Sequence, residues 1–277
     1  MISGRTTLIA HLGFPTEAFK SPMIYNPYFE DAGIDAVVVP MGVQAADYPA
    51  FLKQLFRVTN LRGALVTMPH KVTTMSLADE VTPTATIAGA ANALLKRPDG
   101  SMLADQFDGA GFVRGVQRRG RELKGASALV VGSGGVGSAI AASLAWAGVS
   151  RIGLYDVNAA SAEALGSRLA KHYPDLEVVT GSNDPAGFQI VVNATPMGMN
   201  EGDPLPMDMS RLDPGTFVGE VVMKQAITAF LAAAQERGCE IQVGTDMLFE
   251  QIPAYLEFFG FPTTTPDRLR ALAKIQY

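Results

Sequence analysis

A glycine-rich run with the spacing G-x-G-x-x-G stands near the middle of the chain, at Gly132-Ser133-Gly134-Gly135-Val136-Gly137. It follows the apolar stretch 127–131 and opens the alanine-rich stretch 136–147, so we expect a turn between a strand and a helix. Glycines at these positions allow a tight turn, approach of the backbone to a pyrophosphate, and close packing of helix on strand. The run therefore predicts a dinucleotide-binding site.

An acidic residue ends the next expected strand. Asp156 closes the stretch 151–156, where a carboxylate can bond both hydroxyls of an adenosine ribose. The same charge would repel a 2′-phosphate, and the following Val157-Asn158 offers no arginine to bind one. The sequence thus favours NAD over NADP as cofactor, with a plain surface aspartate as the alternative interpretation.

Length and composition bound the class of protein. A chain of 277 residues favours two domains, and 48% hydrophobic with 18% charged residues predicts a globular protein rather than a disordered one. The net charge of −5 argues against a nucleic-acid partner bound through phosphate neutralisation.

Targeting and metal signals are weak. The start of the chain lacks the basic patch and apolar run of a secretory signal, and the apolar stretch 139–149 is too short to span a bilayer. Cys239 is the single cysteine, and the three histidines have no metal-ligand spacing. We expect a cytoplasmic protein without structural metal or membrane partner, as a monomer or a homodimer.

The first hundred residues alternate strand and helix patterns. We expect strands at 6–12, 36–40 and 63–67, and helices at 22–32, 48–58 and 70–79. A further short element is expected at 89–95, followed by a turn at 97–100. Such alternation predicts a mostly parallel sheet covered by helices on both faces.

A second alternating series follows. Expected strands are 127–131, 151–156, 176–179, 190–193 and 216–222, and expected helices are 109–120, 136–147, 159–172, 226–238 and the region from 245 onward. The fold class is α/β, with a Rossmann-type dinucleotide domain (107–243) inserted in a second α/β domain that binds substrate (1–106 plus 244–277). The cleft between the domains is the expected site.

Further motifs occur in a defined order along nearly the whole chain. They are Gly13-Phe14-Pro15 with Lys20-Ser21-Pro22, Val66-Thr67-Met68-Pro69-His70-Lys71, Gly89-Ala90-Ala91-Asn92, Asp108-Gly109-Ala110-Gly111-Phe112, Asn193-Ala194-Thr195-Pro196-Met197-Gly198-Met199, and Met247-Leu248-Phe249-Glu250-Gln251. On these motifs the chain resembles the shikimate/quinate dehydrogenase family. The resemblance implies hydride transfer between a nicotinamide cofactor and a cyclic polyhydroxy acid, shikimate, quinate or an analogue, giving its keto form.

The resemblance makes Lys71 and Asp108 the catalytic pair. Oxidation of a secondary alcohol by hydride transfer requires a group that accepts the hydroxyl proton, and a lysine can do so. Lys71 follows Pro69, which suits a helix's first turn, and a cation there opposes the helix dipole, which favours loss of its proton. Asp108 could bond the neighbouring hydroxyl and hold Lys71 in place. A solvated lysine and an Asp-Gly turn are the alternatives.

Residues that bind the ligands follow from the same resemblance. Asn92 and Gln251 would bond ring hydroxyls, with Thr67 and Ser21 in the same site, whereas a loop cap and a helix-face amide are the alternatives for Asn92 and Gln251. The expected cofactor-binding residues are Gly132, Ser133, Gly134, Gly135, Val136, Gly137, Asp156, Asn193, Thr195, Met199, Val221 and Gly244. Core packing is the usual role of a methionine such as Met199.

Several positions depart from the family pattern. Its first loop normally reads Ser-x-Ser-Pro, whose hydroxyls bind the substrate carboxylate; here the first position is Phe19 and only Ser21 remains. Met223 stands where a tyrosine usually reaches the carboxylate, and Leu65 and Phe107 add apolar surface. We therefore expect weak shikimate activity, and a better substrate that keeps vicinal hydroxyls but carries a smaller, neutral or differently placed acidic group. The alternative is that Ser21 and other residues bind the carboxylate.

A second class of function is a non-catalytic dinucleotide-binding protein, such as a redox-sensing subunit on the same fold. A sensor needs neither Lys71 nor Asp108, so their joint presence favours an enzyme.

Overall fold

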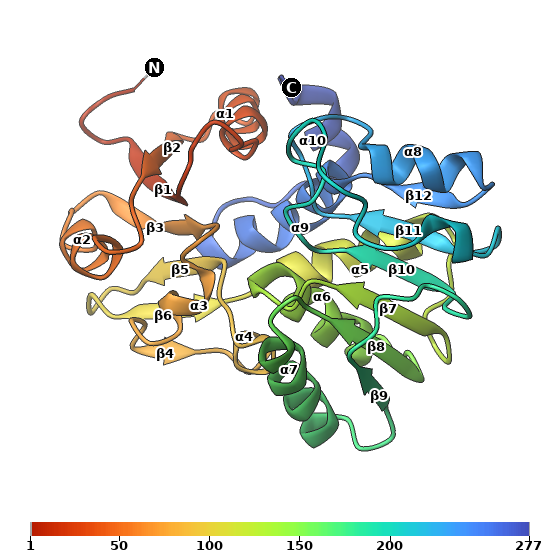
Figure 1. Ribbon diagram of the computed structural model, residues 1–277. Coiled ribbons are helices and arrows are strands. Elements are labelled where there is room, and N and C mark those ends of the chain that lie inside the picture. The colour runs from red at the N-terminus through yellow and green to blue at the C-terminus, as the bar shows by residue number, and fades with distance from the viewer. Residues whose placement is uncertain (1, 277) are drawn as a thin grey trace. The chain divides into compact units, whose positions relative to one another are not determined.

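The computed structural model describes residues 2–276, which divide into two compact units (Figure 1). The first unit contains the chain up to Phe107 together with 251–276, and the second contains 108–250. The chain therefore leaves the first unit and returns to it. The return lies inside a helix, α9 (Gly244–Phe259), and not ahead of that helix at 243/244.

The first unit is built on a six-stranded sheet in the order β2-β1-β3-β5-β6-β4. Its elements are β1 (Thr7–Gly13), α1 (Pro22–Asp31), β2 (Ala36–Gly42), α2 (Tyr48–Leu55), β3 (Leu61–Val66), α3 (Lys71–Thr74), β4 (Glu80–Val81), α4 (Pro83–Ala88), β5 (Ala93–Lys96), β6 (Met102–Asp105) and α10 (Pro266–Leu272). β1 pairs in parallel with β2 and β3, whereas β5 runs antiparallel to β3 and β6. The sheet is thus mixed, because the turn at 97–100 joins β5 and β6 as a hairpin.

The expected helix over 70–79 is wrong beyond its first turn. The structure forms one helical turn, Lys71–Thr74, after which the chain runs into the sheet edge at β4. The β-branched run Val72-Thr73-Thr74 disfavours helix continuation, and the N–H of Asp79 bonds the carbonyl of Met102 instead. The short α4 was also missed, although Thr82 caps its first turn and Gly89 ends it in the left-handed region.

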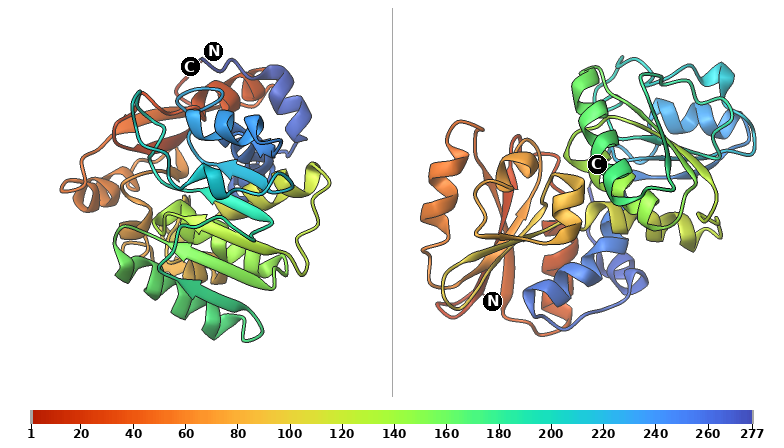
Figure 2. Two further views of the ribbon diagram at one scale, coloured as in Figure 1. Left: turned by 45° about the vertical axis from the view of Figure 1, so that its right-hand side comes forward. Right: turned by 90° about the horizontal axis from the view of Figure 1, so that it is seen from below.

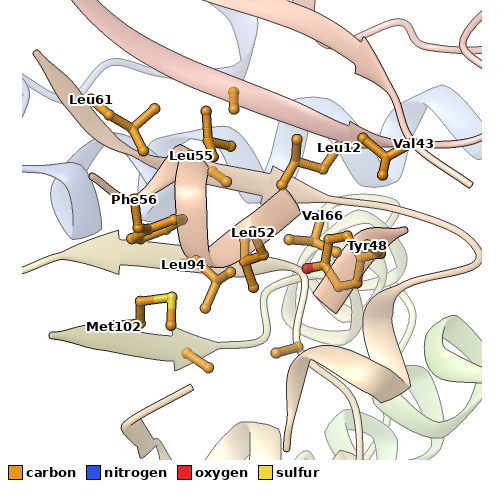
Figure 3. Close-up of a cluster of buried hydrophobic side chains, with 14 of the residues drawn as sticks. Leu12, Val43, Tyr48, Leu52, Leu55, Phe56, Leu61, Val66, Leu94 and Met102 are labelled. Atoms are coloured by element: carbon orange, nitrogen blue, oxygen red, sulfur yellow. The ribbon is translucent and has the colours of Figure 1, made fainter. Parts of the chain in front are cut away.

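Apolar side chains of α2 join the strands of the first unit. Tyr48 and Leu52 are fully buried against Leu12, Val66 and the β5 side of the sheet (Figure 3). Helix α10 and the part of α9 from Gln251 onward belong to the same unit, and α10 lies beside α1 (Figure 2).

The second unit is a fully parallel sheet in the order β12-β11-β10-β7-β8-β9. Its elements are α5 (Asp108–Arg118), β7 (Ser127–Val131), α6 (Gly135–Trp146), β8 (Arg151–Tyr155), α7 (Ala159–His172), β9 (Glu177–Thr180), β10 (Ile190–Asn193), the 3-10 turn η1 (Met209–Arg211), β11 (Phe217–Glu220), α8 (Ala229–Glu236) and β12 (Glu240–Gln242). The chain builds outward from β7 through β9, then returns to β10 on the other side of β7. This order is that of a Rossmann-type fold, and the α/β fold class is confirmed.

The strand order fixes where ligands bind in the second unit. In open α/β sheets the ligand lies outside the carboxyl ends of the strands, at the point where the strand order reverses. That point is between β7 and β10, whose last residues, Val131 and Asn193, are register partners.

Among the described helices of the chain, none is both long and apolar enough to cross a membrane.

Candidate active site

The glycine run forms the turn from β7 into α6, as expected. Gly132 has φ +103°, a conformation that favours glycine, and a Cβ there would lie 2.7 Å from the carbonyl oxygen of Ala194. A Cβ on Gly137 would lie only 1.8 Å from the carbonyl oxygen of Gly132. Helix α6 begins at Gly135, with Gly134 as its N-cap. The turn therefore presents a helix N-terminus and backbone N–H groups, the arrangement that binds a pyrophosphate.

Asp156 lies directly after β8 and supports this turn. One carboxylate oxygen accepts a hydrogen bond of 2.7 Å from the N–H of Ser133, and the other accepts one of 2.9 Å from the N–H of Asn158. The Oγ of Ser133 is buried without a hydrogen-bond partner within the described residues. Both groups fit a dinucleotide: the carboxylate ends the second strand of the Rossmann fold, and the loop carries an unpartnered hydroxyl within the described residues.

The remaining expected cofactor residues gather at the carboxyl ends of β10 and β11. Asn193 bonds the carbonyl of Met197 through Nδ2, and its Oδ1 accepts from the N–H and the hydroxyl of Thr195. The N–H of Val221 bonds the Asn193 carbonyl, and the first residue of α9, Gly244, packs against the backbone at Val222. The amide of Asn193 therefore holds the loop that leads to Met199, which is partly buried.

Lys71 is buried at the start of α3, and its neighbours are held firmly. The adjacent His70 stacks on Tyr48 with ring centroids 3.9 Å apart, and its Nε2 bonds the carbonyl of Val43. The hydroxyl of Thr74 bonds the His70 carbonyl and shares a 2.7 Å hydrogen bond with the Tyr48 hydroxyl. A single helical turn has little dipole, so the expected dipole effect on Lys71 does not apply. The hydrogen bonds of His70 and Thr74 fix the backbone on both sides of Lys71.

Asn92 lies beside Lys71. The N–H of Ala91 donates to the Lys71 carbonyl, and the N–H of Val66 donates to the Asn92 carbonyl at 2.7 Å. The side-chain oxygen of Asn92 accepts from the N–H of Phe107, whereas its Nδ2 is buried without a partner among residues 2–276. The backbones of Lys71 and of the residue before Asn92 are thus bonded, and Asn92 carries an unsatisfied amide donor.

Helix α9 contributes an unpartnered hydrogen-bond acceptor, whereas Asn92 contributes a donor. The hydroxyl of Tyr255 donates to the Asn92 carbonyl at 3.0 Å. Gln251 lies four residues earlier on the same helix and so shares the face of Tyr255. Its Oε1 is buried and has no partner within the described part of the chain. Donor and acceptor amides suited to sugar-like hydroxyls therefore belong to one unit.

Thr67, Ser21 and Phe19 complete the expected substrate residues of the first unit. The N–H of Thr67 bonds the carbonyl of Leu12 at the end of β1. Ser21 is buried at the N-cap of α1, and its hydroxyl makes no cap hydrogen bond. Phe19 is buried and stacks on His11, with ring centroids 4.1 Å apart. Asp108, the other half of the expected catalytic pair, is the buried first residue of α5 in the second unit.

Sequence reasoning missed three polar groups of the first unit. His11 lies buried in β1, Tyr25 has a buried hydroxyl without a partner in the described chain, and Tyr255 bonds Asn92. A histidine inside an otherwise apolar strand was the available signal for His11. The tyrosines gave none, because a tyrosine in an apolar helix pattern is indistinguishable from core.

Glu220 is a buried carboxylate in the second unit. Both its oxygens lie 2.9 Å from the hydroxyl of Thr228, and burial raises its pKa to about 7 despite the hydrogen bonds from Thr228 and Asn193. Within residues 2–276, no group of three or more His, Cys, Asp or Glu side chains could hold a metal ion.

Comparison with known proteins bears on these sites. Residues 12–94 match the family model of the shikimate dehydrogenase substrate binding domain, and residues 112–180 match that of the ThiF family. The shikimate dehydrogenase (NADP(+)) of Rubrobacter xylanophilus is 36% identical over 254 residues, covering 90% of this chain and 89% of that protein. The chain belongs to the shikimate dehydrogenase family.

Solved structures of the shikimate dehydrogenase family have the same fold as this chain. The shikimate 5-dehydrogenase of Listeria monocytogenes, in complex with shikimate and NAD, has a TM-score of 0.87 and 28% identity, covering 98% of this chain and 97% of that one. The quinate dehydrogenase of Corynebacterium glutamicum, in complex with NAD, has a TM-score of 0.86 and 28% identity over 96% of this chain and 98% of that one.

Membership confirms the family resemblance and the two-part fold, a Rossmann-type unit with a substrate unit. The chain is an NAD(P)-dependent dehydrogenase, and the non-catalytic alternative is not favoured.

Proposed function

We propose that this dehydrogenase interconverts a secondary alcohol of a hydroxylated ring, of the shikimate and quinate class or an analogue, with the corresponding ketone. The observation that carries this function is the backbone hydrogen bond from Ala91 to Lys71, because it joins the lysine's backbone to the segment of Asn92, whose Nδ2 is buried without a partner among the described residues. A proton acceptor and a hydroxyl-binding group at one edge of a sheet suit alcohol oxidation.

Lys71 takes the hydroxyl proton when the alcohol is oxidised, and returns it when the ketone is reduced. A nicotinamide cofactor bound to the second unit would supply the hydride chemistry at the same carbon. Asp108 bonds the neighbouring hydroxyl and favours the productive orientation. Asn92 donates to a ring hydroxyl, Gln251 accepts from one, and Thr67 and Ser21 contact the same ring.

The second unit holds the cofactor through the glycine turn. Backbone N–H groups at Gly134, Gly135 and Val136 receive the pyrophosphate, and Ser133 and Gly137 shape the turn around it. The nicotinamide end would be held by residues at the carboxyl ends of β10 and β11 and at the start of α9: Asn193, Thr195, Met199, Val221 and Gly244.

We further propose that NAD is preferred over NADP. Asp156 presents a carboxylate where the adenosine ribose lies, and the next residues, Val157 and Asn158, carry no positive charge to bind a 2′-phosphate. The Rubrobacter xylanophilus relative carries NADP(+) in its name, so this preference would set the chain apart from it.

Formation of reduced nicotinamide tests the function directly. The purified chain is mixed with NAD or NADP and with shikimate, quinate and neutral ring polyols in turn. Turnover of a ring alcohol that is faster with NAD supports both proposals. Turnover only with NADP contradicts the cofactor preference, and no turnover of any ring alcohol contradicts the function.

We also propose that the protein is a monomer or a homodimer, which sedimentation tests. Its proposed location is the cytoplasm, which cell fractionation tests.

A further inference from the structure

A histidine lies among mostly apolar residues of strand β1, and it has no part in the proposed proton transfer. His11 is buried, and its ring stacks on Phe19 with an interplanar angle of 26°. Its Nδ1 has no hydrogen-bond partner among the residues that the structure describes. A buried ring nitrogen without a partner is costly, and a ligand hydrogen bond would remove that cost.

His11 lies beside the proposed proton acceptor. The charge of Lys71 acts on the imidazole, and the carbonyl of the next residue, Leu12, accepts from the N–H of Thr67. Phe19 reaches the same place: a Cβ on Gly13 would lie 2.8 Å from Cζ of Phe19 and 2.4 Å from Cγ2 of Thr67. The imidazole, the phenyl ring and Thr67 therefore meet at the carboxyl end of β1.

The imidazole of His11 is uncharged. Burial foremost, and the charge of Lys71, lower its pKa to about 3. A neutral imidazole has one donor and one acceptor nitrogen, so it can bond a hydroxyl or a carbonyl group. It gives a carboxylate no opposite charge, and the apolar ring of Phe19 on its face gives none either.

Lys20 and the unpartnered polar atoms of the first unit also favour an uncharged substrate group. The ammonium of Lys20 donates to the carbonyl of Gln276. Besides Nδ1 of His11, three uncharged buried atoms of the unit have no partner within the described residues: the Tyr25 hydroxyl, Nδ2 of Asn92 and Oε1 of Gln251. Each is uncharged and matches a hydroxyl better than a carboxylate.

We propose that His11 is a specificity-determining residue that hydrogen-bonds, through Nδ1, an uncharged hydroxyl or carbonyl group of the substrate. Phe19, stacked on it, keeps a carboxylate away from this end of the site. The preferred substrate is a neutral ring polyol or its ketone rather than a cyclic acid. This narrows the proposed dehydrogenase function and rests on it.

A matched pair of substrates tests the role of His11. Shikimate and its primary amide share the ring and the hydroxyls, and only the charge of the substituent differs. The wild type is expected to give a kcat/KM about tenfold or more higher for the amide. In His11→Leu this value falls about tenfold, chiefly through KM, while the value for shikimate changes little. His11→Asn, which keeps a polar atom near the place of Nδ1, restores most of the loss.

His172→Leu, on the exposed end of α7, is the control substitution, and thermal unfolding of each variant checks folding. A tenfold preference of the wild type for shikimate would overturn the inference and leave the dehydrogenase function standing. So would an unchanged KM for the amide in a folded His11→Leu variant. If no ring alcohol is oxidised with either cofactor, the dehydrogenase function itself fails, and the role of His11 fails with it.

Discussion

The N–H of Ser133 donates a 2.7 Å hydrogen bond to the carboxylate of Asp156, which ties the end of β8 to the glycine turn after β7. The carboxylate that should bind the ribose thus also fixes the turn that should bind the pyrophosphate. A charge-assisted hydrogen bond of this kind contributes roughly 1.5–3 kcal/mol. Cofactor choice and loop geometry depend on the same side chain.

Asp156→Ala should therefore weaken NAD binding by about 10- to 100-fold, because it removes the ribose contact and loosens the turn. NADP should lose less, since a repulsive charge is removed with the contact, so the gap between the cofactors narrows. Calorimetric titration with both cofactors measures this, with the exposed Asp175→Ala as control. Equal affinities for NAD and NADP in the wild type would remove Asp156 from the role assigned to it.

Gln251→Met should separate stability from function. The substitution keeps the side-chain length and removes a buried acceptor that lacks a partner, so the free energy of unfolding should stay equal or rise by about 1 kcal/mol. The KM for the ring substrate should rise about tenfold, because a substrate hydroxyl loses its acceptor. Urea unfolding and steady-state kinetics check the two halves, with the exposed Gln54→Met as control. A clear loss of stability with unchanged KM would mean that Gln251 is structural.

Phe19→Ser should improve the use of shikimate. The serine hydroxyl can donate to a carboxylate, whereas the phenyl ring cannot, so kcat/KM for shikimate should rise several-fold to tenfold. Loss of the stacked ring should cost about 3–5 kcal/mol of stability, because Phe19 is buried against His11. Kinetics on shikimate and quinate decide the matter. A wild-type KM for shikimate at the low end of the usual enzyme range, with full turnover, would contradict the altered substrate preference.

The raised pKa of Glu220 should make the free energy of unfolding depend on pH. Its pKa is about 7 in the folded chain, against an ordinary value of 4.5, because burial disfavours the charged form. The folded state therefore binds more protons across this window, and the free energy of unfolding should fall as pH rises from 4.5 to 7, by roughly 3 kcal/mol in all. Glu220→Gln should remove most of this fall, whereas the exposed Glu236→Gln should not. Denaturant midpoints on both sides of the window test it, and a flat wild-type profile would refute it.

The sequence predicted the second unit better than the first. Its strands 127–131 and 190–193 and its helix 159–172 coincide with β7, β10 and α7, because long apolar or amphipathic stretches between clear turn residues decide their own structure. In the first unit, β4 and the one-turn α3 are too short to show a period. The structure of β4 depends on backbone pairing with β6, which comes later in the sequence.

The site was predictable where a motif fixes the backbone, as at Gly132 and Gly137. It was not predictable where partners meet only in the fold. The bond from Tyr255 to Asn92 joins residues separated by most of the chain, and the stacking of Phe19 on His11 needed the register of β1. The unpartnered atom of His11 became visible only once every neighbour was placed.

Lys71 is proposed to transfer the substrate proton, and the turnover number of Lys71→Ala tests this role most directly. With NAD and the best ring substrate both saturating, kcat should fall by about 10²–10⁴-fold, since general acid–base catalysis contributes that much. Calorimetry should show cofactor affinity nearly unchanged, and the exposed Lys53→Ala should behave as wild type. Asp108→Asn should show the same pattern in kcat. If Lys71→Ala keeps more than about a tenth of the wild-type kcat, proton transfer by Lys71 is contradicted.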